Sequence, residues 1–363
     1  MSGKFQVGIL GATGTVGQRL IQLLENHPQF QVTVVAGSDR SEGKIYAEAC
    51  IWKLPGDMPP RVKGLRVQAP VPPFECDLIF SSLPATIAQS VEEEFARAGY
   101  PIISNSSACR MHKDVPLLIP EVNHDHLRML RLQQSTRGYA PGGFIVTNPN
   151  CSTIMLALTL APIYRTFGLT AVVITTMQAL SGAGYPGVPS LDVTDNVLPY
   201  IQNEEEKIER ETLKILGQMK NLEIEEATFP VSAQCHRVNV SDGHMAAIRV
   251  RLAKPASLEA LRDALGSFTA LPQKMNLYSA PEKPLIIREE LDRPQPRLDR
   301  SAGGGMSVTV GRILPDRVLD YRFVALSHNT IRGAAGAAIL NAELPVAQGY
   351  ISLPRSRISR HEI

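Results

Sequence analysis

The sequence lacks the apolar run of roughly 18 residues that a membrane-spanning helix needs. The N-terminal residues, Met1 to Leu10, also lack the apolar core and the cleavage site of a signal peptide. The sequence also has no large excess of positive or negative residues, since the formal net charge is only +2. Such a balance creates no field that attracts nucleic acid or acidic membranes. We therefore expect a cytoplasmic protein whose partners include no nucleic acid and no membrane.

Cysteines are few and odd in number. The five cysteines include no CxxC pair, which argues against a disulfide scaffold and against a zinc site. His124 and His126 lie close together but come without further ligands, so we expect no metal. In a reducing compartment, a cysteine in a polar turn can instead act as a nucleophile.

The first part of the chain alternates short apolar strands with helices. The 363 residues are enough for two globular domains. Strands are expected at residues 5–10, 31–36, 77–81 and 101–104, with helices at 16–25 and 87–98. This order predicts an α/β fold with a Rossmann-like, doubly wound parallel sheet.

Beyond residue 148 the expected strands lie farther apart, which predicts an α+β second domain. They fall at residues 171–179, 245–252, 306–313 and 321–326. We expect a long helix after Cys151 and another helix over 329–340. The polar stretch 128–143 looks loop-like and is assigned no role; it ends in Pro-Gly-Gly, so its latter part is interpreted as an exposed loop.

Three glycines, Gly11, Gly14 and Gly17, follow the first strand and open a helix. Glycines here allow a tight turn and let a pyrophosphate approach the backbone, where the helix N-terminus offers free N–H groups. Glycine turns also occur for geometric reasons alone. The strand–turn–helix context favours a nucleotide site.

The residues after the second strand bear on the choice between NAD and NADP. Ser38 and Arg40 are able to hold a 2′-phosphate by hydrogen bonds and charge. Asp39 favours NAD instead, because an acidic residue at this position can accept a hydrogen bond from a ribose hydroxyl. These residues favour NADP but leave NAD open.

Cys151 lies in Asn148-Pro149-Asn150-Cys151-Ser152-Thr153, between a strand and a long apolar helix. The dipole of a helix N-terminus stabilises a thiolate, which is the form that attacks an acyl group. A small buried cysteine is the alternative. Cys109 is a rival, in a polar segment, 104–110, that either cradles an anion or forms an ordinary Ser/Asn turn.

His244 follows Asp242-Gly243 and so lies at a turn. There it can project into a cleft as a general acid or base, although a solvent-exposed histidine is the more common case. Residues 200–219 predict an amphipathic helix on which Glu204 falls within the apolar arc and Lys207 at its border. Taken alone, that helix is interpreted as one with ordinary surface charges.

Seven segments together resemble aspartate-semialdehyde dehydrogenase, and most of all its archaeal and fungal branch. They are GATGTVGQ, SNSSACRM, NPNCST, SGAGYPGVPSLD, the EEEK helix, RVNVSDGH and HNTIRGAAGA. They occur in the order of that family and span Gly11 to Ala337. NPNCST and SGAGYPG are specific to it, whereas the glycine fingerprint is not.

The resemblance implies reductive dephosphorylation of aspartyl phosphate with NADPH to give aspartate semialdehyde. Cys151 would form a thioester and release phosphate, His244 would be the acid/base, and Gln178 would orient the intermediate. For substrate binding, Arg237 would clamp the carboxylate and Glu204 would meet the ammonium group. Phosphate would be bound by Arg110 and Lys207, with Asn105 also among the substrate-binding candidates.

The resemblance also implies the cofactor site and the domain limits. The NADP-binding candidates are Gly11, Thr13, Gly14, Thr15, Val16, Ser38, Arg40, Ser41, Ser82 and Asn329. We expect an NADP-binding domain at residues 1–149 and a catalytic and dimerisation domain at 150–327. A C-terminal helix at 328–363 would return to the first domain. A homodimer or homotetramer is implied, and the pathways would be lysine, methionine and threonine synthesis.

Other functions use the same residues. A malonyl-CoA reductase or an acylglutamyl-phosphate reductase would share the machinery and differ in substrate. A cysteine acyltransferase or hydrolase would use Cys151 and His244 without redox chemistry, against which the dinucleotide fingerprint argues. A nucleotide-binding regulator without catalysis would leave Cys151 no more reactive toward a thiol reagent than Cys76.

Overall fold

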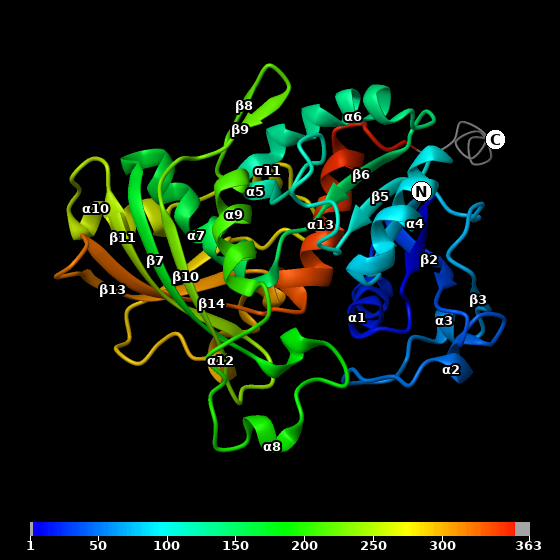
Figure 1. Cartoon of the computed structure of the whole chain (residues 1–363), viewed down its shortest axis with the longest axis horizontal. Coiled ribbons are helices and arrows are strands. Elements are labelled where there is room, and N and C mark those ends of the chain that lie inside the picture. Colours follow the sequence, from blue (N-terminus) through cyan, green and yellow to red (C-terminus); the bar gives the residue numbers. More distant parts are fainter. Residues whose placement is uncertain (1–2, 353–363) are drawn as a thin grey trace. The chain divides into compact units, whose positions relative to one another are not determined.

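A computed structural model describes residues 3–352 of the chain, shown in Figure 1. The chain divides into two compact units. The first contains the described residues up to Leu117, His126–Asn148 and the described residues from Ala338. The second contains Leu118–Asp125 and Pro149–Ala337. The expected domain limits after residues 149 and 327 stay a prediction, and the end of the expected C-terminal helix segment, 353–363, lies outside the described residues.

The first unit is built on a parallel sheet with the strand order β3-β2-β1-β4-β5-β6. Its strands are β1 (Phe5–Leu10), β2 (Phe30–Ala36), β3 (Val67–Gln68), β4 (Leu78–Ser81), β5 (Pro101–Ser104) and β6 (Phe144–Thr147). This is the doubly wound order of dinucleotide-binding folds. The predicted Rossmann-like fold class is confirmed, and β1 and β5 have the predicted bounds.

Helices complete the first unit. They are α1 (Thr15–Leu24), α2 (Tyr46–Ala49), α3 (Pro60–Lys63), α4 (Ala85–Arg97), α6 (Met129–Arg137) and most of α13 (Gly336–Ala347). On α1, Leu20, Ile21 and Leu24 are buried and recur at the spacing of one helix face. That face fixes the start of the helix next to the end of β1.

The second unit is built on a mixed sheet with the order β10-β7-β11-β14-β13-β12. Its strands are β7 (Leu169–Gln178), β10 (Val231–Arg237), β11 (His244–Leu252), β12 (Leu285–Arg288), β13 (Val308–Pro315) and β14 (Tyr321–Ser327). A separate hairpin joins β8 (Gln218–Lys220) to β9 (Glu223–Glu225). This arrangement confirms the predicted α+β class of the second part.

Helices of the second unit include one long apolar member, α7, which contacts several strands of the sheet. They are α5 (Pro120–Asn123), α7 (Cys151–Phe167), α8 (Ser190–Val193), α9 (Glu204–Ile215), α10 (Leu258–Gly266), α11 (Leu271–Lys274) and α12 (Pro296–Asp299). Short helical turns lie at Leu180–Ala183 and Ala302–Gly305, and a π-helix lies at Ile331–Ala335.

The register of the second sheet brings several chain segments to one edge. β10 pairs with β7 in parallel, so Arg237 lies opposite Gln178 where both strands end. β11 runs antiparallel to β7 and begins at the same edge with His244. β14 runs antiparallel to β11 and ends there, with Ser327 opposite His244. Residues far apart in the sequence therefore meet at one end of this sheet.

Two predicted segments were wrong. The helix expected over 200–219 begins at Glu204, after Asn203 in the left-handed conformation, and ends at Ile215 before the chain enters the hairpin. Asparagine tolerates that conformation better than most residues. The stretch interpreted as loop-like holds α6, which ends at Gly138 in a left-handed cap. Only its latter part, with Pro141 and Gly142 exposed, matches the prediction.

Candidate active site

The glycine-rich turn of the first unit is shaped to accept an anion. Gly11 has a φ of +75°, and a Cβ there would lie 2.9 Å from the carbonyl oxygen and the hydroxyl of Ser82. Gly14 is the N-cap of α1, and no described side chain caps this helix. The first N–H groups of α1 therefore keep their capacity to bind a phosphate.

Three side chains fix this turn by donating hydrogen bonds to its backbone carbonyl groups. The buried hydroxyl of Tyr46 donates to the carbonyl of Ala12 at 2.7 Å. The amide of Gln18 donates to the carbonyl of Thr13 at 2.9 Å. The hydroxyl of Ser82 donates to the carbonyls of Leu10 and Gly11. Because these bonds use carbonyl groups, they fix the turn without occupying its N–H groups. Ser82 thus supports the turn, and Thr13 and Thr15 lie partly exposed on it, beside Val16.

The residues that bear on NADP lie at the end of β2. Ser38, Asp39 and Arg40 are all exposed there. Ser41 is buried, and its hydroxyl donates to the carbonyl of Ser38 at 2.8 Å. Ser41 therefore shapes the turn that presents Ser38 and Arg40. An exposed arginine at this position suits a 2′-phosphate.

Cys151 is the first residue of α7, and the side chain of Asn150 caps that helix. The Asn150 Oδ1 accepts the N–H groups of Ser152 and Thr153 at 2.9 and 3.1 Å. Cys151 is partly exposed, unlike Cys50, Cys109 and Cys235, which are buried. The cap orients the helix start, and the helix dipole stabilises a thiolate there.

A buried carboxylate, that of Glu204, connects this cap to the sheet edge. Its Oε1 accepts from the Asn150 amide at 2.8 Å and from the Gln178 amide at 3.1 Å. Glu211, two turns further along α9, accepts the backbone N–H of Asn150 at 2.7 Å. Glu204 and Gln178 therefore belong to one hydrogen-bonded group with the residue that precedes Cys151.

His244 is fully buried, so the solvent-exposed alternative for this residue is wrong. Its Nδ1 accepts the backbone N–H of Ala179 at 3.0 Å. Since a backbone N–H can only donate, the proton of the neutral ring lies on Nε2. Burial, and then the charges of Arg237 and His328, lower the pKa of His244 to about 3. Among the described residues, Nε2 has no hydrogen-bond partner.

Arg237, at the end of β10, is buried and donates through Nη1 to the carbonyl of Ala179 at 2.7 Å. Burial lowers the pKa of its guanidinium, while the thiolate of Cys151 and the carboxylate of Glu204 raise it. Ala179 thus bonds His244 through its N–H and Arg237 through its carbonyl. One backbone unit after Gln178 sets the positions of both side chains.

Gly182 lies against the same two side chains. A Cβ on this residue would lie 2.8 Å from Nη1 of Arg237 and 2.8 Å from Nε2 of His244. Contacts this short do not occur for a real side chain, so only glycine leaves both groups in place. The first glycine of the SGAGYPG segment, Gly182, is therefore explained by its close approach to these two side chains.

The other candidate residues of the second unit lie nearby in the fold. Lys207 is partly exposed and stands one turn after Glu204 on α9. Asn329 follows β14; its Oδ1 accepts the N–H of Gly243 at 2.8 Å, and its amide donates to the Ser181 hydroxyl at 2.7 Å. Asn329 therefore ties the turn before His244 to the segment that carries Gly182.

Arg110 and Asn105 lie in the first unit. Arg110 is buried and donates through Nη2 to the backbone carbonyl of Asn105 at 2.8 Å. Asn105 is partly exposed, and its Oδ1 accepts from the Asn148 amide at 3.1 Å. Cys109 belongs to the hydrophobic core of this unit. Burial, and then the charge of Glu92, raise the pKa of its thiol to about 12. Cys109 is therefore a core residue and not a rival nucleophile.

Sequence reasoning gave no role to Asn150, Ser181, Gly182 or Glu211. Only Asn150 had a usable signal, because an asparagine directly before a long apolar helix is a common N-cap. In the part of the chain that the structure describes, no group of three or more histidine, cysteine or acidic residues is placed to hold a metal ion. No helix among residues 3–352 is long and apolar enough to cross a membrane.

Comparison with protein families finds two matching domains. Residues 6–130 match the NAD binding domain of semialdehyde dehydrogenase. Residues 160–332 match the semialdehyde dehydrogenase dimerisation domain. Together the two matches include most of both units.

Individual proteins match over nearly their whole length. Aspartate-semialdehyde dehydrogenase of Methanothermobacter thermautotrophicus is 52% identical over 342 residues, covering 93% of this chain and 98% of that protein. The Saccharomyces cerevisiae enzyme of the same name is 44% identical, covering 97% of this chain and 100% of its own. The crystal structure of the Candida albicans enzyme with NADP aligns with a TM-score of 0.89 at 42% identity, covering 96% of this chain and 100% of that one.

Substituting Gly182 tests the close approach to Arg237 and His244. We expect Gly182→Ala to lower kcat/KM about 100-fold, because the methyl group must displace one or both side chains, and small displacements in a site cost that much. Steady-state kinetics and a thermal unfolding curve measure the effect. The control is Gly64→Ala, where no described atom lies within 4 Å of the added Cβ. Full activity in Gly182→Ala would contradict the stated geometry.

The pH profile tests the depressed pKa of His244. Because the neutral ring persists until the pH falls far below the ordinary value of about 6.5, protonation of His244 should not reduce kcat/KM between pH 5 and 7. A profile of kcat/KM over pH 4.5–9, on the protein and on His244→Gln, measures this. An acid limb near pH 6.5 that disappears in His244→Gln would show that the ring ionises normally.

Proposed function

This chain belongs to the aspartate-semialdehyde dehydrogenase family, and we propose that its reaction proceeds through a thioester on Cys151. The reaction is the NADPH-dependent reductive dephosphorylation of L-4-aspartyl phosphate to L-aspartate 4-semialdehyde. One observation carries the proposal for the site. Cys151 stands at a capped helix start whose cap is bonded, through Glu204, to Gln178 at the sheet edge that also presents Arg237 and His244.

In the first step the Cys151 thiolate attacks the acyl carbon and the bond to the phosphate oxygen breaks. The N-terminus of α7 and the cation of Arg237 both favour the thiolate. The released phosphate keeps the electron pair of the broken bond. Arg110 and Lys207 are proposed to bind that phosphate, because both are cations and Arg110 presents a guanidinium fork.

The carboxylate and the ammonium group of the substrate are proposed to bind side chains of opposite charge. A buried guanidinium such as that of Arg237 suits a planar carboxylate, to which it can donate two parallel hydrogen bonds. The carboxylate of Glu204 is proposed to meet the ammonium group while its Oε1 holds Asn150 and Gln178. Gln178, held by Glu204, is proposed to orient the acyl group on Cys151.

His244 is proposed to act through Nε2. In the neutral ring this atom carries the proton, and Nδ1 is occupied by the N–H of Ala179. An Nε2–H donor stabilises the negative charge that develops on the acyl oxygen, and buried donors of this kind contribute strongly to catalysis. Any proton that His244 gives or takes in an acid/base role must pass through the same atom.

NADP is the cofactor, and the first unit fits it. The uncapped start of α1 and the close approach at Gly11 accept a pyrophosphate, while Ser38 and Arg40 are exposed for a 2′-phosphate. When bound, NADPH supplies the hydride that reduces the acyl carbon. Thr13, Thr15 and Val16 are proposed to line this site, and Asn329 to support it. Once the acyl carbon has been reduced, its bond to the sulfur of Cys151 breaks, which releases the aldehyde and leaves the electron pair on Cys151 as a thiolate.

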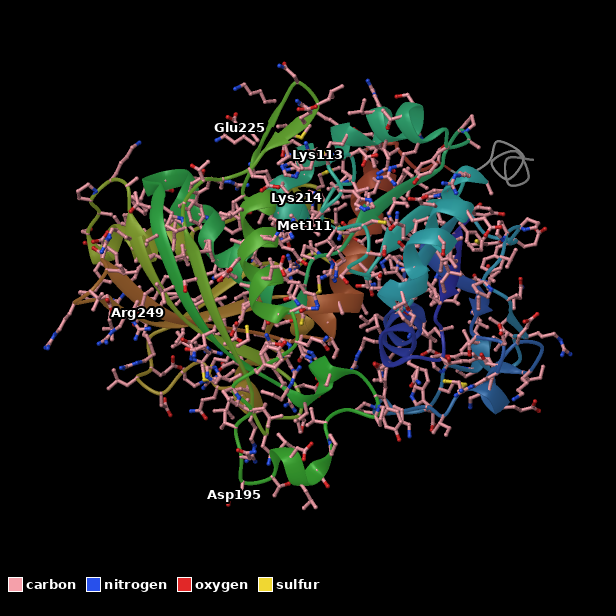
Figure 2. The ribbon with its side chains drawn as sticks, viewed as in Figure 1. Met111, Lys113, Asp195, Lys214, Glu225 and Arg249 are labelled. Carbon is pink, nitrogen blue, oxygen red and sulfur yellow. The ribbon has the colours of Figure 1, made fainter. Side chains whose placement is uncertain are left out.

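A homodimer, or a tetramer built from such dimers, is proposed to form through the sheet of the second unit. Its sequence matches a dimerisation domain. Along β7 and β11, buried residues alternate with partly exposed ones, and the paired Met177 and Met245 and the pair Ala247 and Val324 belong to the partly exposed set. Arg249 belongs to the same set (Figure 2). A half-exposed sheet face that combines these apolar residues with Arg249 is suited to pairing with a second copy.

The reverse reaction tests the proposed chemistry. Purified protein with L-aspartate semialdehyde, phosphate and NADP should form NADPH, seen at 340 nm, only when phosphate is present. Cys151→Ser should abolish this, because a hydroxyl does not form the required nucleophile at a helix start. Arg237→Ala should raise the KM for the semialdehyde, since the carboxylate loses its partner.

Controls separate the possible outcomes. Cys76→Ser changes another partly exposed cysteine and should leave the rate unchanged. NADPH formation without phosphate would reject the acyl-phosphate step. A protein that binds NADP and shows no turnover would reject the substrate, and malonyl-CoA would then be assayed. An unchanged KM in Arg237→Ala would remove the proposed clamp.

Oligomeric state tests the proposed interface. We expect light scattering to give the mass of two or four chains, and Val173→Glu to reduce it, because a buried unpaired charge is costly. Val173 is 38% exposed on β7. Ile51→Glu, at a residue that is 75% exposed in the first unit, is the matched control. A monomer with full activity would contradict the interface.

A further inference from the structure

The segment that carries Arg110 has little regular structure of its own. After β5 ends at Ser104, residues 105–116 contain turns and no helix or strand. Yet Arg110 must be held in place if, as proposed above, it binds the phosphate. The inference below rests on that role and concerns what fixes the segment.

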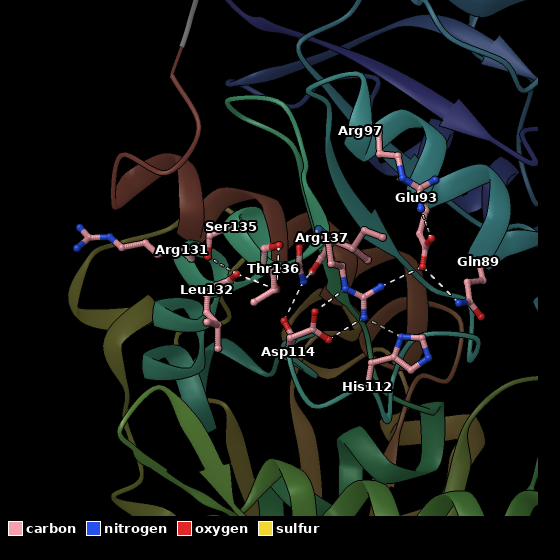
Figure 3. A network of polar contacts seen from close by, with 12 residues as sticks. Gln89, Glu93, Arg97, His112, Asp114, Arg131, Leu132, Ser135, Thr136 and Arg137 are labelled. Atoms are coloured by element: carbon pink, nitrogen blue, oxygen red, sulfur yellow. Dashed lines mark hydrogen bonds and ion pairs between the residues drawn. The ribbon is translucent and has the colours of Figure 1, made fainter.

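Arg137, the last residue of α6, is bonded to this segment at two points (Figure 3). Its Nε and Nη2 donate to the two carboxylate oxygens of Asp114, the second at 2.7 Å. Nη2 also donates to Nδ1 of His112 at 3.1 Å. The bond to Asp114 is the main cause that lowers the pKa of that carboxyl. This is the bidentate geometry in which arginine bonds a carboxylate best.

The same guanidinium reaches a second helix. Its Nη1 donates to Oε1 of Glu93 on α4 at 3.0 Å. The side chains of Arg137, Asp114 and Glu93 are 19%, 22% and 16% exposed, so water competes little for these bonds. Arg137 therefore connects α6, α4 and the segment at His112 and Asp114.

A neighbour on α6 strengthens the attachment. The amide of Gln133 donates to the carbonyl of Asp114 and to that of Ile145 on β6, each at 3.0 Å. Its Oε1 accepts the N–H of Ile145 at 2.7 Å. One end of the segment is thus fixed both by its backbone and by its carboxylate.

Short turns transmit this attachment to Arg110. The N–H of Val115 bonds the carbonyl of His112 at 3.2 Å, and the N–H of His112 bonds the carbonyl of Cys109 at 3.1 Å. Cys109 is buried in the core and anchors the middle of the segment. Arg110 is the next residue, and its Nη2 donates to the backbone carbonyl of Asn105 at 2.8 Å.

We propose that Arg137 is a positioning residue for phosphate binding: by bonding Asp114, His112 and Glu93 it holds the segment in the conformation that presents Arg110 and Asn105. The stretch that the sequence left without a role thereby gains one. Arg137 itself contacts no substrate in this proposal. Its effect is on the affinity for phosphate and not on the chemistry at Cys151.

Kinetics of the reverse reaction test the proposal. At saturating semialdehyde and NADP, Arg137→Ala should raise the KM for phosphate about tenfold and change kcat less than about twofold, since only the phosphate-binding group is displaced. Arg137→Lys should give a smaller increase, because lysine keeps the charge and loses the planar fork. Asp114→Asn provides a second route to the same effect if Arg137→Ala does not fold.

Arg97→Ala is the matched control. Arg97 bonds the other oxygen of Glu93 at 2.7 Å, but its side chain is 55% exposed and it does not reach the segment (Figure 3). We expect its KM for phosphate to stay within about twofold of the unsubstituted protein. Equal increases in Arg97→Ala and Arg137→Ala would overturn the proposal, because they would trace the effect to α4 alone.

A variant that combines Arg110→Ala with Arg137→Ala tests whether Arg137 acts through Arg110. In an Arg110→Ala background, Arg137→Ala should add no further increase in the KM for phosphate, since both act through Arg110. If Arg110→Ala raises that KM and Arg137→Ala does not, the positioning role fails while the proposed function stands. If Arg110→Ala leaves it unchanged, the phosphate role of Arg110 fails and the inference falls with it. Equal losses in kcat and in the affinities for phosphate and NADP would show a general structural defect and overturn the proposal.

Discussion

The carboxylate of Glu204 is the interaction on which the catalytic half of the site depends. It is buried and accepts hydrogen bonds from Asn150 and Gln178. A buried charge is tolerated only when it is well bonded. These bonds fix the start of α7, where Cys151 stands, relative to the end of β7. A charged residue on a helix interpreted as ordinary surface from the sequence thus sets the geometry around Cys151, the proposed nucleophile.

The strand register supplies the rest of that half. Because β10 is parallel and β11 antiparallel to β7, Arg237 and His244 come to the edge where Gln178 ends its strand. Ala179 then bonds both side chains through a single backbone unit. Burial keeps His244 neutral next to a cationic Arg237. The site accordingly holds a fixed positive charge and a neutral donor, which we propose to bind the substrate carboxylate and a developing oxyanion.

The first unit also contains two separate functional segments, the turn at Gly11 and the segment after β5. The turn at Gly11 is proposed to bind the nucleotide, and the side chains that fix this turn bond its carbonyl groups without occupying the N–H groups at the start of α1. The segment after β5 has no ladder to define it. It is held instead by side chains from α6, of which Arg137 also bonds Glu93 on α4. Irregular segments that carry functional groups commonly need such external support.

The sequence by itself determined the features that depend on neighbouring residues. β1 and β5, the glycine turn, the long helix after Cys151 and the fold class follow from local apolar patterns and turn residues. The motifs that place the chain in its family are likewise contiguous. Only the tertiary structure distinguished Cys109 in the core from Cys151 at a partly exposed helix start. It also buried His244, made α6 a helix with a function for Arg137, and explained Gly182 by atoms from β10 and β11. The physical reason is that burial and close approach are set by residues distant in sequence, and no local pattern records them.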